Sequence, residues 1–156
     1  MAYKVLVIDD EPNIVRLVKA RLNANGYEVI SASNGKEGLE IARQQLPDLI
    51  LLDIMMPQMN GEKTLIELKK DIRTQKIPVI MLTAKQDADD IVRCIHDLGA
   101  SDYVVKPFVA GEFLRKINTV VSGTQKVPES IVEKDLMDTV EDRIRKALDG
   151  KNKSRK

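Results

Sequence analysis

Short apolar runs alternate with amphipathic stretches along the first 121 residues of the chain. The runs have the length and the aliphatic, β-branched composition of buried strands, and the stretches between them place apolar residues at helical spacing. Alternation of this kind indicates a parallel sheet that is covered by helices on both faces. The expected strands are Lys4–Ile8, Glu28–Ala32, Leu49–Leu52, Pro78–Leu82 and Asp102–Val105.

Five helices are expected to follow these five strands. The first begins at Pro12, which suits the start of a helix, and ends at Gly26. Right-handed crossovers leave few topologies, so we expect an α/β fold: a flavodoxin-like, doubly wound, five-stranded parallel sheet in the order 2-1-3-4-5, with five helices. The apolar faces are marked by Ile14, Leu17, Val18 and Leu22; Leu39 and Ala42; Leu65, Leu68 and Ile72; Ile91, Ile95 and Leu98; and Phe113, Ile117, Val120 and Val121.

The chain changes character after Val121, so we expect one domain over residues 1–121. Residues 122–129 are expected to form a linker, 130–150 an amphipathic C-terminal helix and 151–156 a basic, disordered tail. Ser130 and Glu133 fit a capping box, and Gly150 suits the C-terminal end of the helix. A lone helix of this length is marginal in water, so its apolar stripe needs a partner. We expect a homodimer through this helix, with folding back onto its own domain as the alternative.

Composition excludes several classes of protein. The formal net charge is +1 and aromatic residues make up 3% of the chain, which disfavours nucleic acid as a partner. No apolar run is long enough to cross a membrane, and we expect neither a membrane nor a signal peptide. The single cysteine, Cys94, fits a reducing cytoplasm.

Polar side chains lie at the ends of four of the expected strands. Asp9 and Asp10 follow the first, Asp53 ends the third, Thr83 ends the fourth and Lys106 ends the fifth. In an open parallel sheet these positions converge at one edge, where such folds bind ligands. A pair of acids after a strand is often only a solvated loop, a threonine there is often a cap, and a lysine before proline is often a surface residue. Their joint placement favours a functional site.

The chemistry of these groups points to phosphoryl transfer. Carboxylate oxygens suit Mg²⁺, which keeps several waters and accepts phosphate oxygens. A carboxylate can attack phosphorus to give an acyl phosphate, and Asp53 is the most central candidate. Asp10, with Asp9, would hold the metal, while Lys106 would offset charge on the phosphoryl group and Thr83 would donate a hydrogen bond to it.

Four motifs resemble the receiver domains of two-component response regulators. They are Val5–Glu11 with its paired aspartates, Leu51–Gly61 around Asp53, Val79–Ala84 ending in Thr-Ala, and Asp102–Phe108 with its Lys-Pro. They occur in the family's order and spacing over roughly residues 1–121. The chain therefore resembles a receiver of the single-domain type with a C-terminal helical extension.

The resemblance implies a role for each matching residue. Asp53 would be the phosphoacceptor, and Asp9, Asp10, Asp53 and the main-chain carbonyl of Met55 would bind Mg²⁺. Thr83 and Lys106 would contact the phosphoryl group, Tyr103 would be the switch aromatic, and the Lys106–Pro107 bond would be cis. A sensor histidine kinase or a phosphotransfer protein would donate the phosphoryl group, and a downstream protein would recognise the switched surface. No turnover of an external substrate is expected.

Two alternatives stay open. A phosphohydrolase of the haloacid-dehalogenase type also uses an aspartate nucleophile with Mg²⁺, but its nucleophile ends the first strand. The chain could also be the receiver part of a truncated DNA-binding transcription factor, although residues 122–156 offer one credible helix and a helix-turn-helix needs two. We expect no direct contact with nucleic acid.

Overall fold

Five parallel strands form one sheet in the computed structural model, which describes residues 2–84, 88–108 and 110–123. The strand order is β2-β1-β3-β4-β5, which confirms the predicted order 2-1-3-4-5. Edge strands β2 and β5 each pair with one neighbour, and β3 lies at the centre. The strands are β1 (Lys4–Ile8), β2 (Glu28–Ala32), β3 (Leu49–Asp53), β4 (Val79–Thr83) and β5 (Asp102–Val105).

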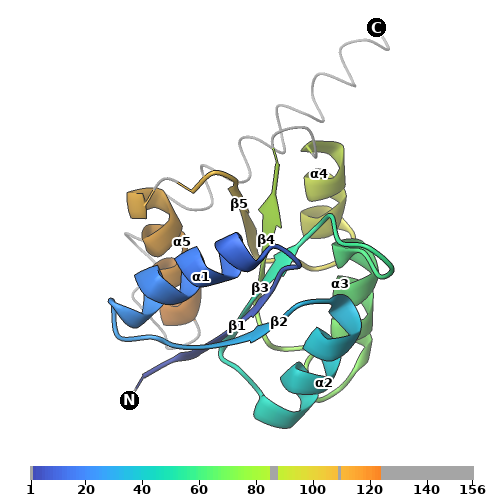
Figure 1. The fold of residues 1–156 in the computed structure, drawn as a ribbon. Coiled ribbons are helices and arrows are strands. Elements are labelled where there is room, and N and C mark those ends of the chain that lie inside the picture. Colours follow the sequence, from blue (N-terminus) through green and yellow to red (C-terminus); the bar gives the residue numbers. More distant parts are fainter. Residues whose placement is uncertain (1, 85–87, 109, 124–156) are drawn as a thin grey trace, which may run out of the picture.

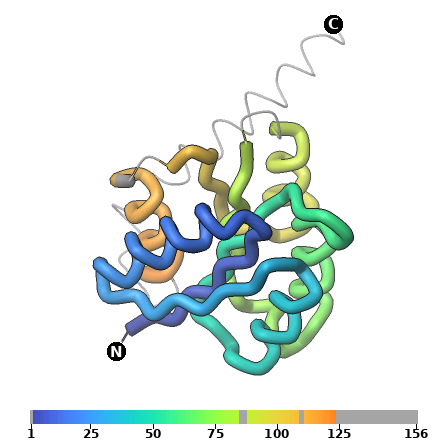
Figure 2. The backbone as a smooth tube through the Cα atoms, in the orientation of Figure 1, coloured from blue at the N-terminus to red at the C-terminus, as the bar shows by residue number. Residues whose placement is uncertain are grey.

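Helices cover both faces of the sheet, as Figures 1 and 2 show. Two of them, α1 and α5, lie on one face, and α2, α3 and α4 lie on the other. Each of the first four helices connects two parallel strands, as right-handed crossovers require, and α5 follows the last strand, β5. The helices are α1 (Pro12–Asn23), α2 (Gly35–Gln45), α3 (Gly61–Lys70), α4 (Ala88–His96) and α5 (Ala110–Gly123).

The two-residue period of β1 shows how the strands build two cores. Val5 and Val7 pack in the cluster under α1 and α5, which includes Phe113 of α5. Leu6 and Ile8 pack in the other cluster, under α2, α3 and α4. Successive side chains of a strand point to opposite faces, so a strand that is buried on both sides must be apolar throughout.

Several boundaries differ from those expected. β3 and β4 each extend one residue beyond the expected ranges, so that Asp53 and Thr83 are their last residues, and β4 begins at Val79 and not at Pro78. Ile72, which we expected on the apolar face of the third helix, lies beyond Lys70 and is 82% exposed, so this assignment is wrong. Helix α5 continues through Gly123 into the expected linker. The expected helix over residues 130–150 and the tail over 151–156 lie outside the described residues.

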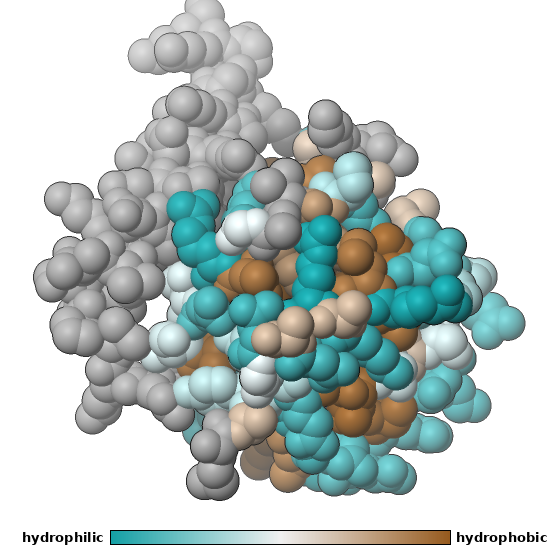
Figure 3. Space-filling model, turned by 60° about the vertical axis from the view of Figure 1, so that its left-hand side comes forward, coloured by the Kyte–Doolittle hydropathy of each residue, from teal (hydrophilic) through white to brown (hydrophobic). Residues whose placement is uncertain are grey.

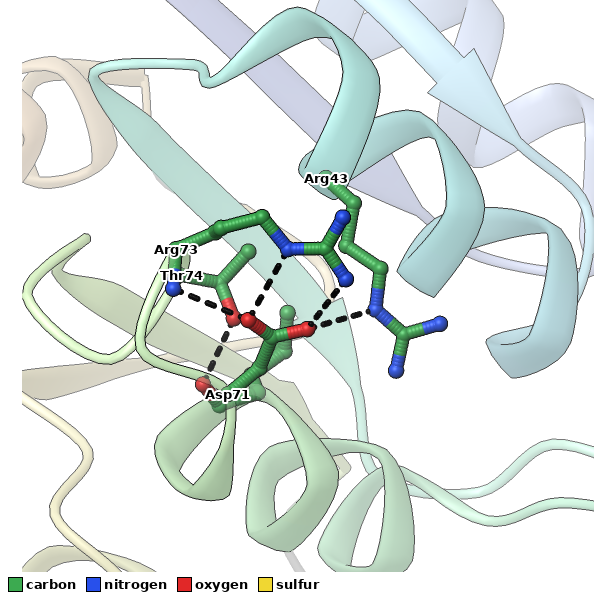
Figure 4. Close-up of polar contacts among 5 residues, drawn as sticks. Arg43, Asp71, Arg73 and Thr74 are labelled. Atoms are coloured by element: carbon green, nitrogen blue, oxygen red, sulfur yellow. Dashed lines mark hydrogen bonds and ion pairs between the residues drawn. The ribbon is translucent and has the colours of Figure 1, made fainter.

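The end of α3 is held to α2 by a group of ionic contacts around Asp71. Figure 4 shows its carboxylate between two arginine side chains. Arg43 of α2 donates to Asp71 Oδ2 at 2.8 Å, and Arg73 donates to both carboxylate oxygens at 3.2 and 3.0 Å. These hydrogen bonds hold the pKa of Asp71 well below its usual range, with Arg73 the main cause. Residues distant in sequence are thus joined on the face that carries α2 and α3.

Apolar side chains that reach the surface are scattered. Leu17, Leu46, Met55 and Ile72 are the large exposed ones among the described residues, and they belong to different segments of the chain. Figure 3 shows separate hydrophobic patches between hydrophilic side chains on the face that it presents. Within the described ranges, no helix is both long and apolar enough to span a bilayer.

Candidate functional site

The sheet brings the predicted site residues together through its register. Ile8 of β1 pairs with Leu52 of β3, so the next residues along the two strands, Asp9 and Asp53, are neighbours. On the other side, Asp53 pairs with Leu82 of β4, next to Thr83. Parallel strands end at the same edge of the sheet, and the site lies at that edge.

Three carboxylates and one ammonium group form the centre of the site. Oxygen atoms of Asp9, Asp10 and Asp53 lie within 4.8 Å of one another. Lys106 Nζ lies 2.8 Å from Asp9 Oδ2 and 3.4 Å from Asp53 Oδ1. It also lies 3.6 Å from Glu11 Oε1, a contact that the sequence analysis did not predict. One lysine therefore bridges the two buried carboxylates and reaches a third acid at the surface.

Burial makes ionisation of Asp53 unfavourable. Its residue exposure is 4%, and that of Asp9 is 1%, whereas Asp10 is exposed. Burial and the charge of Asp9 raise the pKa of Asp53 to about 7, although Lys106 acts in the opposite direction. Burial alone would lower the pKa of Lys106, but its hydrogen bond to Asp9 and the charge of Asp53 raise it instead. The lysine therefore stays charged beside carboxylates that repel each other.

Backbone groups fix both buried carboxylates. Asp9 Oδ1 accepts from the Glu11 N–H at 2.9 Å, and Asp53 Oδ1 accepts from the Met55 N–H at 3.3 Å. The start of α3 also touches this backbone, because the Gly61 N–H donates to the Ile54 carbonyl at 2.8 Å. A Cβ atom at Gly61 would lie 2.1 Å from the Asp53 carbonyl oxygen. This close approach has no signal in the sequence, because only the packing of α3 on β3 creates it.

The residues expected to act in switching lie on β4 and β5. Thr83 is buried, and its hydroxyl donates to the Ala84 carbonyl at 2.9 Å. Tyr103 is half-buried, and its ring lies 4.3 Å from Lys116 Nζ of α5. Lys116 was not predicted as a site residue. The peptide bond between Lys106 and Pro107 is cis, as the resemblance implied.

The residues present fit a divalent cation with oxygen ligands. Among the described residues, the carboxylates of Asp9, Asp10, Asp53 and Glu11 surround one ammonium group, that of Lys106, so negative charge predominates when all are ionised. Hard oxygen donors in a cluster of net negative charge are typical of Mg²⁺ sites that keep open positions for water and phosphate. Asp9, Asp10 and Asp53 would be the side-chain ligands. The main-chain carbonyl of Met55 was the fourth expected ligand and stays a prediction.

The family model of the response regulator receiver domain matches residues 5–118. The chain belongs to the response regulator receiver family. Members of this family are receivers of two-component signalling systems, are not substrate-turnover enzymes, and generally bind Mg²⁺. This assignment leaves the phosphohydrolase alternative without support, in line with Asp53 ending β3 and not β1.

Known relatives of the receiver differ in length. Probable transcriptional regulator ycf27 of Pyropia yezoensis is 42% identical over 128 residues, 82% of this chain and 51% of that protein. Protein PilH of Pseudomonas aeruginosa is 39% identical over 120 residues, 77% of this chain and 98% of PilH. The crystal structure of a receiver domain protein from Clostridium thermocellum matches with a TM-score of 0.73 and 35% identity, covering 80% of this chain and 98% of that one. The receiver thus spans about half the length of the ycf27 relative.

Proposed function

We propose that this receiver is switched by phosphorylation of Asp53. The observation that supports this best is the contact of the Asp53 carboxylate with Lys106 inside a cluster of acids at the central strand end. In the transfer, a carboxylate oxygen of Asp53 attacks phosphorus while the bond from phosphorus to the donor nitrogen or oxygen breaks. The leaving atom keeps that electron pair. The product is an aspartyl phosphate on β3.

The acidic cluster prepares Asp53 for this reaction. Without a cation, about half of a carboxyl with a pKa of about 7 is protonated at neutral pH, and the protonated form is a poor nucleophile. Bound Mg²⁺ would lower this pKa and offset charge on the phosphoryl oxygens. Asp9 and Asp10 would hold the ion together with Asp53 and the Met55 carbonyl. Lys106, already 3.4 Å from Asp53, is placed to pair with a phosphoryl oxygen.

Thr83 and Tyr103 would convert phosphorylation into a change of surface. The phosphoryl group adds about −1.5 to −2 charge and three acceptor oxygens. The Thr83 hydroxyl, on the strand beside Asp53, would turn from the Ala84 carbonyl toward these oxygens and vacate space for the Tyr103 ring. The surface formed by α4, β5 and α5 would then change, and a partner that prefers one state would respond to it.

Three partners follow from this proposal. A sensor histidine kinase or phosphotransfer protein would donate the phosphoryl group, and a downstream protein would recognise the switched surface. A second copy of the chain would pair through residues 130–150. The reducing environment suggested by Cys94, which is fully buried here, fits a cytoplasmic location for these reactions.

Asp53 is tested by replacing it with asparagine. Wild-type protein incubated with acetyl phosphate and Mg²⁺ should gain one phosphoryl group by intact mass, and Asp53→Asn should gain none. Asp48→Asn, at the exposed residue before β3, is a matched control that should gain phosphate at the wild-type rate. Phosphorylation of Asp53→Asn at the wild-type rate would refute the assignment.

The ycf27 relatives support a second candidate function, control of transcription. They are named transcriptional regulators, so our expectation that nucleic acid plays no part loses its support. We propose that the phosphorylated receiver acts on DNA as a regulatory unit. Retention of genomic fragments by the phosphorylated chain, compared with Asp53→Asn, tests direct binding. If neither protein retains DNA fragments, direct DNA binding is refuted and the switching of a protein-interaction surface is the only function still proposed.

A further inference from the structure

The edge strand β5 has a polar anchor at Tyr103 that lies away from the acidic site. β5 is the last strand of the sheet, so its outer side pairs with no described strand. The Tyr103 N–H donates to Asp102 Oδ1 at 2.7 Å, and the Tyr103 carbonyl accepts from Lys116 Nζ at 2.6 Å. Edge strands leave such backbone groups unpaired, and two charged side chains satisfy them here.

Both side chains of this anchor are buried. Asp102 is 0% exposed and Lys116 is 4% exposed. Their charged atoms lie 3.6 Å apart, and Glu112 lies at the same distance from the ammonium group on its more exposed side. Asp102 Oδ2 is also buried and has no hydrogen-bond partner among the described residues. Burial of two charges is costly, so the pair is poor evidence of added stability and better evidence of a specific arrangement.

The ammonium group also contacts the Tyr103 ring. It lies 4.3 Å from the ring centroid, within the range of a cation–π contact. One lysine of α5 therefore holds Tyr103 by its ring and by its carbonyl, while Asp102 holds its N–H. Tyr103 cannot change its ring position without losing the ring contact or shifting the ammonium group from Asp102.

We propose that Lys116 and Asp102 are positioning residues that hold Tyr103 in one orientation until Asp53 is phosphorylated. The inference rests on the proposed function, in which Tyr103 is the switch aromatic. Lys116 couples β5 to α5, so the ring and the helix respond together. Without the pair, Tyr103 samples several orientations in both states, and phosphorylation changes its position less.

The test follows Tyr103 by fluorine NMR in full-length protein labelled with 3-fluorotyrosine. The chain has three tyrosines and no tryptophan, and Tyr103→Phe identifies the resonance in question. Lys116→Met alone would leave Asp102 charged and buried, so the main variant is Lys116→Met with Asp102→Asn, which removes both charges. Lys116→Arg keeps the charge and should keep the wild-type behaviour. Each protein is measured before and after acetyl phosphate and Mg²⁺, with its phosphorylation checked by intact mass.

Two results are expected in the double variant. Before phosphorylation, the solvent isotope shift of the Tyr103 resonance should rise, because the ring is no longer held against α5. On phosphorylation, movement of this resonance should fall about threefold or more relative to wild type, because one charge-assisted hydrogen bond and one cation–π contact no longer separate the two states. The phosphorylation rate should stay within about twofold of wild type, since β4 lies between Asp53 on β3 and Asp102 on β5.

A second ion pair provides the control for general destabilisation. Arg43→Met with Asp71→Asn removes the contact between α2 and the end of α3 and should lower stability without changing the Tyr103 resonance. Wild-type values of both Tyr103 measurements in the Lys116/Asp102 variant would overturn the inference. If wild-type protein gains no phosphate, the proposed function fails, and the isotope shift before phosphorylation still decides whether Lys116 and Asp102 hold Tyr103.

Discussion

The surroundings of Asp53 destabilise the charged form of its carboxylate. Asp53 ends a fully buried strand, lies beside the carboxylate of Asp9, and is 3.4 Å from the ammonium group of Lys106. Burial removes water from the charged form, and Asp9 repels it, so the pKa rises to about 7. The buried charge therefore lowers the stability of the folded protein, and a bound cation would offset this cost where Asp53 reacts.

From this cost we predict that Asp53→Asn changes the free energy of unfolding in a pH-dependent way, in protein kept free of metal with a chelator. The folded-state pKa is about 7 and the ordinary value is 3.8, so the folded state binds the proton more tightly than the unfolded state. The protonated Asp53 carboxyl therefore contributes stability that is fully present below pH 3.8 and is lost as the pH rises through about 7. Asp53→Asn lacks this loss, so it should exceed wild type by up to about 4 kcal/mol at pH 8 and match it near pH 4.

Urea unfolding of both proteins across this pH range measures the difference. Added Mg²⁺ is the internal control, because at pH 8 it should stabilise wild type more than the variant, which lacks one carboxylate ligand. A difference in stability that does not change with pH would contradict the explanation based on the buried charge.

At the scale of elements, the position of α3 limits the position of Asp53. Asn60 caps the helix by accepting from the Lys63 N–H at 2.9 Å, and Gly61 then brings the first turn against the end of β3. The atoms nearest to a Cβ at Gly61 are backbone atoms of Asp53 and Ile54, which cannot rotate aside as a side chain can. The helix start and the phosphoacceptor backbone therefore form one packed unit.

Gly61→Ala should displace the Asp53 backbone and slow phosphorylation by acetyl phosphate about tenfold or more, because displacements near 1 Å are costly for reacting groups. Gly38→Ala is the matched control. Its Cβ would lie 2.4 Å from Cδ1 of Ile8, a flexible side chain in the core, so it should cost about 1–3 kcal/mol of stability and leave the rate within about twofold. Equal phosphorylation rates in the two folded variants would contradict a role of Gly61 in placing Asp53.

At the scale of the whole molecule, β5 lies at the edge of the sheet, with α4 on one face and α5 on the other (Figure 1). Helix α5 runs through Gly123, the last of the described residues. Lys116 joins α5 to β5 near Tyr103. A change at Tyr103 would therefore be passed to α5 through Lys116.

We predict that the full chain associates as a dimer through its C-terminal segment. Val132, Leu136, Val140, Ile144 and Leu148 recur every four residues, a spacing that suits a short helix–helix contact better than a long coiled coil. Light scattering should give twice the monomer mass for wild type and the monomer mass for Val140→Glu with Ile144→Glu, which would place charges in the apolar stripe. The control variant is Thr139→Glu with Arg143→Glu, at the residues that directly precede Val140 and Ile144 and lie outside the apolar stripe, and it should stay dimeric. A monomer at all concentrations, with and without phosphodonor, would instead favour folding back onto the domain.

Sequence periodicity predicted the class of fold, and the rules for right-handed crossovers and for ligand sites in open parallel sheets then gave the strand order and the convergence of Asp9, Asp53, Thr83 and Lys106. These features follow from local patterns, because a strand buried on both faces must be apolar and a carboxylate at its end needs a separate explanation. Tertiary structure decided what depends on contacts between distant segments. Lysine is usually a surface residue, yet α5 buries Lys116 against Asp102 and Tyr103. Isoleucine is usually a core residue, yet Ile72 lies beyond the end of α3 and is exposed to solvent. The helical spacing of apolar residues does not show at which residue a helix ends.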